Sequence, residues 1–388
     1  MAIMERNTSI DLTRGLVMII MALDHVRDLL HVSSLTQSPT DLSTTTPILF
    51  FTRWITYLCA PAFVFLAGTS AYLSMTRKND LVATRNFLLK RGLWLIFLEF
   101  TLVNFGMWFD LHFSVLIFEV IAAIGLGFLL LALLLRLPAL TLGMMGLLIL
   151  ILQHLFVPAG PQDTLVYKVI SALFVPGAFP YGDGKMVLMA YPPLPWAAIM
   201  LLGFAAGRYF MLEPIQQRRL FGRAGVVLIV SFLVLRCFNI YGDPSSWSMQ
   251  KDAIYSALSF LNVTKYPPSL QFNLLFLGIM CLLLAWGQNL TSKISYYISA
   301  YGKVPLFYFL VHWYIIHPFL FLVIWLQGFK AADMVFGMNF GRPKAESGVP
   351  LWGVYLSWVC LVLIMYPLCK AYWRFKSANP HKTWLRYL

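Results

Sequence analysis

Long apolar stretches, separated by shorter polar segments, set the pattern of this chain. A helix that crosses a membrane needs about 20 consecutive, mainly apolar residues. Such stretches predict about ten helices, at Ile10–His31, Pro47–Ser74, Phe87–Phe109, Phe113–Leu135, Pro138–Val157, Leu194–Leu212, Gly225–Ile240, Leu270–Trp286, Val304–Leu326 and Leu351–Phe375. The pattern therefore predicts an all-α fold, a polytopic integral membrane bundle in which residues 1–388 form a single domain.

Two of the polar segments between these helices hold further candidates for short helices. Thr164–Val175 and Gln250–Val263 have the amphipathic spacing of helices that lie at a membrane surface. Tyrosines and tryptophans occur in and around these segments. Such rings are typical either of sugar binding or of the aromatic belt at the membrane–water interface.

The first expected helix, Ile10–His31, differs from the others because it is rich in ionisable residues. An ionisable group at membrane depth costs roughly 2.5–3.5 kcal/mol on insertion scales, so a helix that serves only as an anchor would not accumulate them. We expect this helix to line a polar site inside the bundle; the alternative is a salt-bridged cluster that only locks the bundle. The ionisable residues are Asp11, Arg14, Asp24, His25, Arg27, Asp28 and His31.

The spacing within this helix separates a cation from an acid–base group. Arg14 and His25 share a helical face and lie eleven residues apart, which is about 16 Å along a helix axis. We expect Arg14 near one membrane surface and His25 beyond the midplane. A carboxylate beside a histidine can orient the ring and raise its basicity. His25, oriented by Asp24 or Asp28, is therefore a candidate general base for a hydroxyl or an amine.

Other polar residues inside the expected helices extend this candidate site. Arg53 begins the second helix at the depth of the carboxylates on the first helix and is expected to pair with one of them. His312 lies near mid-depth in its helix, and we expect it, with Arg27 and Arg53, to line the same cavity. Glu99 and Glu119 are open to two interpretations, partners for an arginine or protonated structural groups.

Composition supports the membrane assignment and removes one class of partner. The chain is 60% hydrophobic and 12% charged, whereas soluble domains are about 45–50% apolar and about 25% charged. A net charge of +13 would suggest nucleic acid in a soluble protein. Here most lysines and arginines fall in alternate loops, which predicts that both termini are cytoplasmic. We expect the bilayer as a partner and no nucleic acid.

Motifs of soluble enzymes and metal sites are absent from the sequence. There is no P-loop, no Rossmann glycine fingerprint, no GxSxG elbow and no HExxH. None of the five cysteines forms a CxxC pair, so we interpret them as small core residues. We expect no metal.

Five segments spread over nearly the whole chain carry a resemblance to a known family. They resemble the heparan-alpha-glucosaminide N-acetyltransferase catalytic-domain family and its bacterial relatives, within the transmembrane acyltransferases. The segments are Ser9–Gly15 (S-I-D-L-T-R-G), Ala60–Tyr72 (A-P-A-F-V-F-L-A-G-T-S-A-Y), Tyr191–Gly207 (Y-P-P-L-P-W…L-L-G-F-A-A-G), Gly302–His312 (G-K-V-P-L-F-Y-F-L-V-H) and Asn379–Leu388 (N-P-H-K-T-W-L-R-Y-L).

The resemblance implies transfer of an acyl group across the membrane. Acetyl-CoA or another acyl-CoA would bind from the cytoplasm as co-substrate, and an external sugar group would accept the acyl. In the sugar O-acyltransferase branch the proposed catalytic histidine lies eleven residues after the arginine, and His25 matches it. In the glucosaminide branch the key histidine comes later, and His31 could be its counterpart only with a gap.

An anionic co-substrate needs cations at the cytoplasmic mouth of the bundle. The S-I-D-L-T-R-G segment contributes Asp11 and Arg14 to this mouth, and Arg91 and Arg208 are further candidates.

The sequence therefore predicts an acyl-CoA-dependent acyltransferase that acts on a hydroxyl or an amine of an extracytoplasmic sugar or glycan. We expect it in the inner membrane of a bacterium, and homo-oligomerisation stays open. The main alternative is a proton-coupled transporter or lipid flippase, because buried carboxylates and histidines serve proton relays equally well. A non-catalytic assembly subunit is the third interpretation.

Overall fold

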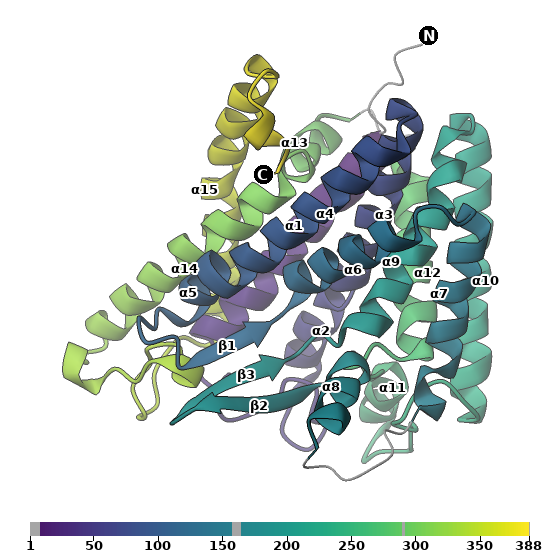
Figure 1. The fold of residues 1–388 in the computed structure, drawn as a ribbon. Coiled ribbons are helices and arrows are strands. Elements are labelled where there is room, and N and C mark those ends of the chain that lie inside the picture. Colours follow the sequence, from purple (N-terminus) through teal and green to yellow (C-terminus); the bar gives the residue numbers. More distant parts are fainter. Residues whose placement is uncertain (1–7, 157–163, 289–291, 388) are drawn as a thin grey trace.

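The protein is a mostly helical bundle with a small sheet at one end (Figure 1). The computed structural model describes residues 8–156, 164–288 and 292–387. Within these ranges, six helical segments are long and apolar enough to cross a membrane: Pro47–Lys78, Pro193–Met211, Pro214–Phe238, Leu270–Gly287, Pro305–Leu326 and Leu351–Ala378. The chain is therefore a polytopic integral membrane protein.

The elements follow one another along the chain with a π-helical turn, Glu99–Val103, between α4 and α5. The helices are α1 (Thr8–Leu30), α2 (Pro47–Thr56), α3 (Cys59–Lys78), α4 (Leu81–Leu98), α5 (Asn104–Trp108), α6 (Val120–Leu134), α7 (Ala139–Leu152), α8 (Leu165–Phe174), α9 (Pro193–Ala206), α10 (Pro214–Phe238), α11 (Ala253–Leu261), α12 (Leu270–Gly287), α13 (Lys293–Gly302), α14 (Pro305–Leu326) and α15 (Leu351–Ala378). The strands are β1 (Val115–Phe118), β2 (Gly177–Gly182) and β3 (Lys185–Met189).

Helices occur at all ten places that the hydrophobic pattern predicts, and α8 and α11 lie within the two expected amphipathic segments. Among the described residues, however, six helical segments rather than the expected ten have the length and apolar content of a membrane span. Three further features differ from expectation. The second expected helix is broken at Tyr57–Leu58 into α2 and α3, α13 was not predicted, and the stretch expected as one helix from Phe113 begins instead as strand β1.

The purely α-helical prediction is wrong because three strands form a sheet of order β1-β3-β2. β1 runs parallel to β3, with Val115 opposite Met186, and β2 runs antiparallel to β3. A run such as Val115–Phe118 is apolar enough to resemble the start of a spanning helix. Its β-branched residues favour a strand once another strand is available to pair with.

Helix α1 is the central element of the bundle. It packs against α2, α3, α12, α13, α14 and α15, and most of its side chains are buried. In Figure 1, α1 begins and α15 ends in the upper part of the view, which we call the terminal end. The sheet, α8 and α11 lie at the opposite end, the sheet end. Neighbouring helices thus shield the charged residues of α1 from lipid.

Two close helix crossings depend on glycines from the segments that carry the family resemblance. A Cβ on Gly302 of α13 would lie 1.9 Å from the carbonyl oxygen of Asp11 in α1, and one on Gly15 would meet the backbone of Ile298 at 2.0 Å. A Cβ on Gly203 of α9 would lie 2.0 Å from the carbonyl oxygen of Phe65 in α3. Only glycine permits these backbones to approach so closely.

The last turn of α1 is held by an arginine from the segment between α14 and α15. Arg342 is buried, and its guanidinium donates to the carbonyl oxygens of His31 (3.0 Å) and Val32 (3.3 Å) and to Ser34 Oγ (2.8 Å). Burial lowers the pKa of Arg342 to about 10, which leaves it charged at neutral pH. A cation just beyond the C-terminal end of α1 complements the helix dipole.

Candidate active site

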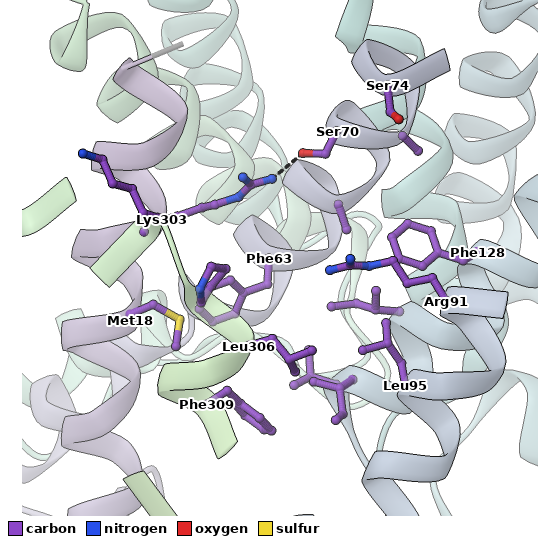
Figure 2. A pocket seen from close by; sticks show the side chains of 18 of the residues that line it. Met18, Phe63, Ser70, Ser74, Arg91, Leu95, Phe128, Lys303, Leu306 and Phe309 are labelled. Carbon is purple, nitrogen blue, oxygen red and sulfur yellow. Dashed lines mark hydrogen bonds between the residues drawn. The ribbon is translucent and has the colours of Figure 1, made fainter. Parts of the chain in front are cut away.

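A cavity of about 400 Å³ opens between α1, α3, α4, α6, α14 and α15, and we call it the terminal cavity. Figure 2 shows Arg91 on one wall and Lys303 on the other, with Phe63, Leu306 and Phe309 along the apolar part. The lining also includes Arg14 and Lys376. Among the described residues that line it, there are four cations and no Asp or Glu, so the cavity is suited to an anionic ligand with an apolar portion.

Arg14 is fixed by the neighbouring helix α3. Its guanidinium donates to the carbonyl oxygen of Leu66 at 2.9 Å and to Ser70 Oγ. Arg91 of α4 donates to the carbonyl oxygen of Arg386, in the C-terminal segment. Two of the three cations expected from the sequence, Arg14 and Arg91, are thus held at this cavity by hydrogen bonds.

A second cavity, of about 170 Å³, lies further along α1 and is called the sheet-side cavity. Its lining is more polar and includes both signs of charge. The polar and aromatic lining residues include Asp24, His25, Asp28, Arg53, Glu119, Tyr191, Lys265, Tyr266, Trp108 and Trp313. A compact polar molecule fits such a lining better than a long apolar one.

Three side chains, Phe63, Val120 and Phe309, line both cavities. Atoms of the same residue therefore face the terminal cavity on one side and the sheet-side cavity on the other. The two cavities therefore adjoin at these residues. We call these three residues the partition.

Asp24 and Asp28 form a compact ion cluster with two arginines. Arg27 donates to Asp24 Oδ1 at 3.0 Å and to Asp28 Oδ1 at 2.6 Å. Arg53 of α2 pairs with Asp24 and lies 4.0 Å from Asp28 Oδ2. The expected pairing of Arg53 with α1 is confirmed. Two anions and two cations balance, which is how buried charges are tolerated.

His25 is half-buried and lines the sheet-side cavity, as expected, but neither aspartate orients it. Its Nδ1 lies 2.6 Å from Nε2 of His312 in α14. Its ring stacks on Trp313, with the centroids 4.3 Å apart. The sequence suggested a carboxylate at this nitrogen, whereas the two carboxylates on α1 face Arg27 and Arg53 instead.

Two residues expected in the cavity lining lie behind it. His312 is fully buried and hydrogen-bonds to the cavity residue His25, and Arg27 is buried beneath the two aspartates. Neither is among the residues that line the sheet-side cavity. Helical spacing placed both side chains at the correct depth, but it could not distinguish the cavity wall from the layer behind the wall.

Three other predicted residues lie away from both cavities. His31 hydrogen-bonds through Nδ1 to Ser33 Oγ at 3.0 Å, next to Arg342. Asp11 is buried at the crossing of α1 and α13. Arg208 is exposed and contacts Tyr209. None of them lines the terminal or the sheet-side cavity.

Lys265 is a site residue that the sequence did not suggest. Its ammonium group lies within the sheet-side cavity, 5.2 Å from the ring centre of Tyr57 and 5.0 Å from that of Tyr266. It comes from the segment between α11 and α12. From the sequence alone, it was only a lysine in an expected external loop, next to a tyrosine. Only the fold shows that this segment covers the cavity. No group of three or more His, Cys, Asp or Glu able to hold a metal occurs among the described residues.

The architecture defines the class of this protein, a membrane-embedded helical bundle with a charged central helix that lines two cavities. Residues 6–238 match the sequence profile of the family described as heparan-alpha-glucosaminide N-acetyltransferase, catalytic. The match covers more than half of the chain, and the chain belongs to this family. Membership implies a membrane acetyltransferase-like activity, with acetyl-CoA as the donor that the family uses. No curated protein sequence matches the chain.

Proposed function

We propose that this protein transfers an acetyl group from cytoplasmic acetyl-CoA to an amine or hydroxyl of an extracytoplasmic sugar or glycan. The observation that carries the proposal is the arrangement along α1. A large cation-lined cavity and a small polar cavity with a histidine adjoin at the partition residues Phe63, Val120 and Phe309. A donor with an anionic head and a long apolar arm, and a compact polar acceptor, match this pair of cavities.

The donor would bind with its phosphates near Arg14 and Arg91 and its arm toward the partition. Arginine is well suited to phosphate because its planar fork can donate two parallel hydrogen bonds. The apolar side chains Leu306 and Phe309 would contact the arm. The thioester would then approach His25 from the terminal side of the partition.

The acceptor would bind in the sheet-side cavity, where His25 acts as general base. As the acceptor oxygen or nitrogen forms a bond to the acyl carbon, its proton moves to the imidazole. The carbon–sulfur bond breaks, and the proton leaves with the sulfur as free thiol. Asp24 and Asp28, neutralised by the arginines, would shape the cavity and attract a cationic or hydroxylated acceptor.

The orientation that this reaction needs has the terminal end in the cytoplasm. The distribution of lysines and arginines in the sequence supports it, because α3 ends with Arg77 and Lys78, and α10 begins with Arg218 and Arg219. We also propose that the whole chain is one catalytic domain. Lys303 and Lys265 follow the residues matched to the family, yet each lines one of the cavities.

The direct test uses purified protein in lipid nanodiscs with acetyl-CoA and a panel of amino sugars and neutral sugars. Acetylated sugar is measured by mass spectrometry, and free thiol is measured in parallel. His25→Asn should lower kcat by about 10²-fold to 10⁴-fold, the usual contribution of a general base. His31→Asn is the matched control on the same helix and should keep wild-type kcat, since His31 lies outside both cavities.

Full activity of His25→Asn would reject the base assignment. Proton flux or lipid transfer without any thiol release from acetyl-CoA would instead support the transporter or flippase interpretation, because such proteins do not cleave the thioester.

A further inference from the structure

The contact between His25 and His312 indicates which ring nitrogens carry protons, as well as where the two rings lie. His312 is fully buried in α14. Its Nδ1 lies 3.2 Å from the carbonyl oxygen of Tyr308, and its Nε2 lies 2.6 Å from Nδ1 of His25. The two imidazoles and the carbonyl therefore form a short hydrogen-bonded chain that ends at the sheet-side cavity.

The carbonyl at one end of this chain fixes where each proton lies. A carbonyl oxygen only accepts hydrogen bonds, so the proton of His312 is on Nδ1. The partners of His312 are a carbonyl and an imidazole, and a buried charge without a counter-ion is costly, so the ring is neutral. Its Nε2 then carries a lone pair and accepts the Nδ1–H of His25. A neutral His25 is left with its own lone pair on Nε2.

The surroundings of His25 leave this Nε2 available. Trp313 stacks on the ring at 4.3 Å with an angle of 20° between the planes, which restricts rotation of the imidazole. Within the described part of the chain, His25 forms one side-chain hydrogen bond, and it is made by Nδ1. His25 lines the sheet-side cavity. The nitrogen with the lone pair is therefore the one that a ligand in this cavity can reach.

We propose that His312 is a positioning residue that fixes His25 in the Nδ1–H tautomer, so that Nε2 takes the proton of the acceptor. The proposal rests on the proposed function for the role of His25, but the tautomer itself does not depend on activity. When Nε2 takes the proton and His25 carries a positive charge, Nε2 of His312 is already placed to accept from Nδ1–H. His312 thus performs the orienting task that the sequence suggested for a carboxylate.

The tautomer can be read by ¹⁵N NMR of the protein labelled with ¹⁵N-histidine, in nanodiscs at a pH where His25 is neutral. The signals of His25 are identified by their loss in His25→Asn. We expect a protonated Nδ1 and an unprotonated Nε2 in the wild type. In His312→Leu the Nε2–H form of His25 should gain population, because leucine offers no acceptor that holds the proton of His25 on Nδ1.

A protonated Nε2 on neutral wild-type His25 would overturn the proposal, as would an unchanged tautomer in folded His312→Leu. His317→Gln is the control for a buried histidine five positions further along α14, whose ring contacts Gly106 and Phe340 but not His25. It should leave the signals of His25 unchanged.

Kinetics supply a second readout that a purely structural role would not produce. His312→Leu should lower kcat by about 10²-fold while the KM for acetyl-CoA stays within about twofold, since the terminal cavity is untouched. His312→Gln offers a side-chain carbonyl oxygen near the former Nε2 position and should recover at least tenfold of the lost kcat. Equal losses in the two variants would contradict the proposal, and if the leucine variant does not fold, the glutamine variant and the wild-type tautomer decide.

The proposed function and the positioning role of His312 can be rejected separately. An active His25→Asn together with an Nδ1–H tautomer in the wild type would reject the proposed function and keep the positioning role of His312. An inactive His25→Asn together with an Nε2–H tautomer would keep the function and reject the positioning role.

Discussion

The two cavities along α1 differ in size and in charge, although one helix contributes to both. The terminal cavity is the larger, about 400 Å³, and its charged lining residues are all cations among those described. The sheet-side cavity, about 170 Å³, combines Asp24, Asp28 and Glu119 with Arg53 and Lys265. The all-cationic lining is suited to an incoming anion, whereas in the sheet-side cavity Asp24 and Asp28 are already paired with arginines.

This difference leads to the largest expected effect, on the free energy of unfolding. Asp24→Asn leaves Arg53 and Arg27 without their shared anion, and breaking a buried ion pair costs about 3–5 kcal/mol. Thermal unfolding in nanodiscs should show a clear drop in Tm. The double variant Asp24→Asn/Arg53→Gln removes one charge of each sign and should regain part of the loss.

The matched control for the ion cluster is Arg208→Gln. This variant removes an exposed cation that lines neither cavity, so Tm should stay unchanged. If Asp24→Asn and Arg208→Gln unfold at the same temperature, the cluster does not stabilise the sheet end.

A smaller effect is expected at the terminal cavity, on donor affinity. Arg14→Gln and Arg91→Gln each remove one cation, and a hydrogen bond to a charged group contributes about 1.5–3 kcal/mol. The KM for acetyl-CoA should therefore rise by roughly tenfold or more in each variant, with kcat much less affected. Titration of the purified variants with CoA measures the same loss without turnover.

Salt offers a second test of the same contrast, because an attraction between charges weakens as ionic strength rises. The donor KM of the wild type should rise with salt, and it should rise less steeply in Arg14→Gln. An acceptor KM that depends on salt as strongly as the donor KM would remove the distinction between the cavities.

The smallest predicted effect concerns Lys265, the cation that lies among tyrosines in the sheet-side cavity. A cation–π contact contributes roughly 0.5–2 kcal/mol, so Lys265→Met should change the acceptor KM by several-fold and leave the donor KM unchanged. The exposed Lys330→Met, in the segment after α14, is the control. A change in the KM for the donor alone would contradict the assignment of Lys265 to acceptor binding.

The hydrophobic pattern predicts most of the fold because each spanning helix carries its own signal. Length and apolar content suffice to locate α12, α14 and α15 within a few residues, whereas α10 begins at Pro214, eleven residues before its expected start. Strand β1 was missed because pairing with β3 comes from some 70 residues further along the chain, where no local pattern indicates a partner.

The candidate site shows the same division between local and distant information. The ion cluster was largely predictable, since Asp24, Arg27 and Asp28 are neighbours on one helix. The partner of His25 was not, because His312 lies 287 positions away and the nearby carboxylates offered a closer alternative. Which of two nearby polar residues faces a cavity depends on the rotation and packing of helices, and periodicity does not determine that.

The partition of Phe63, Val120 and Phe309 has a consequence for the cell. A continuous aqueous channel between the two faces of a membrane would let ions pass and dissipate the electrochemical gradient. Two aromatic side chains and a valine lie where the two cavities adjoin, and apolar constrictions resist the passage of hydrated ions. Under the proposed function, acyl transfer across this layer would not require an open aqueous channel.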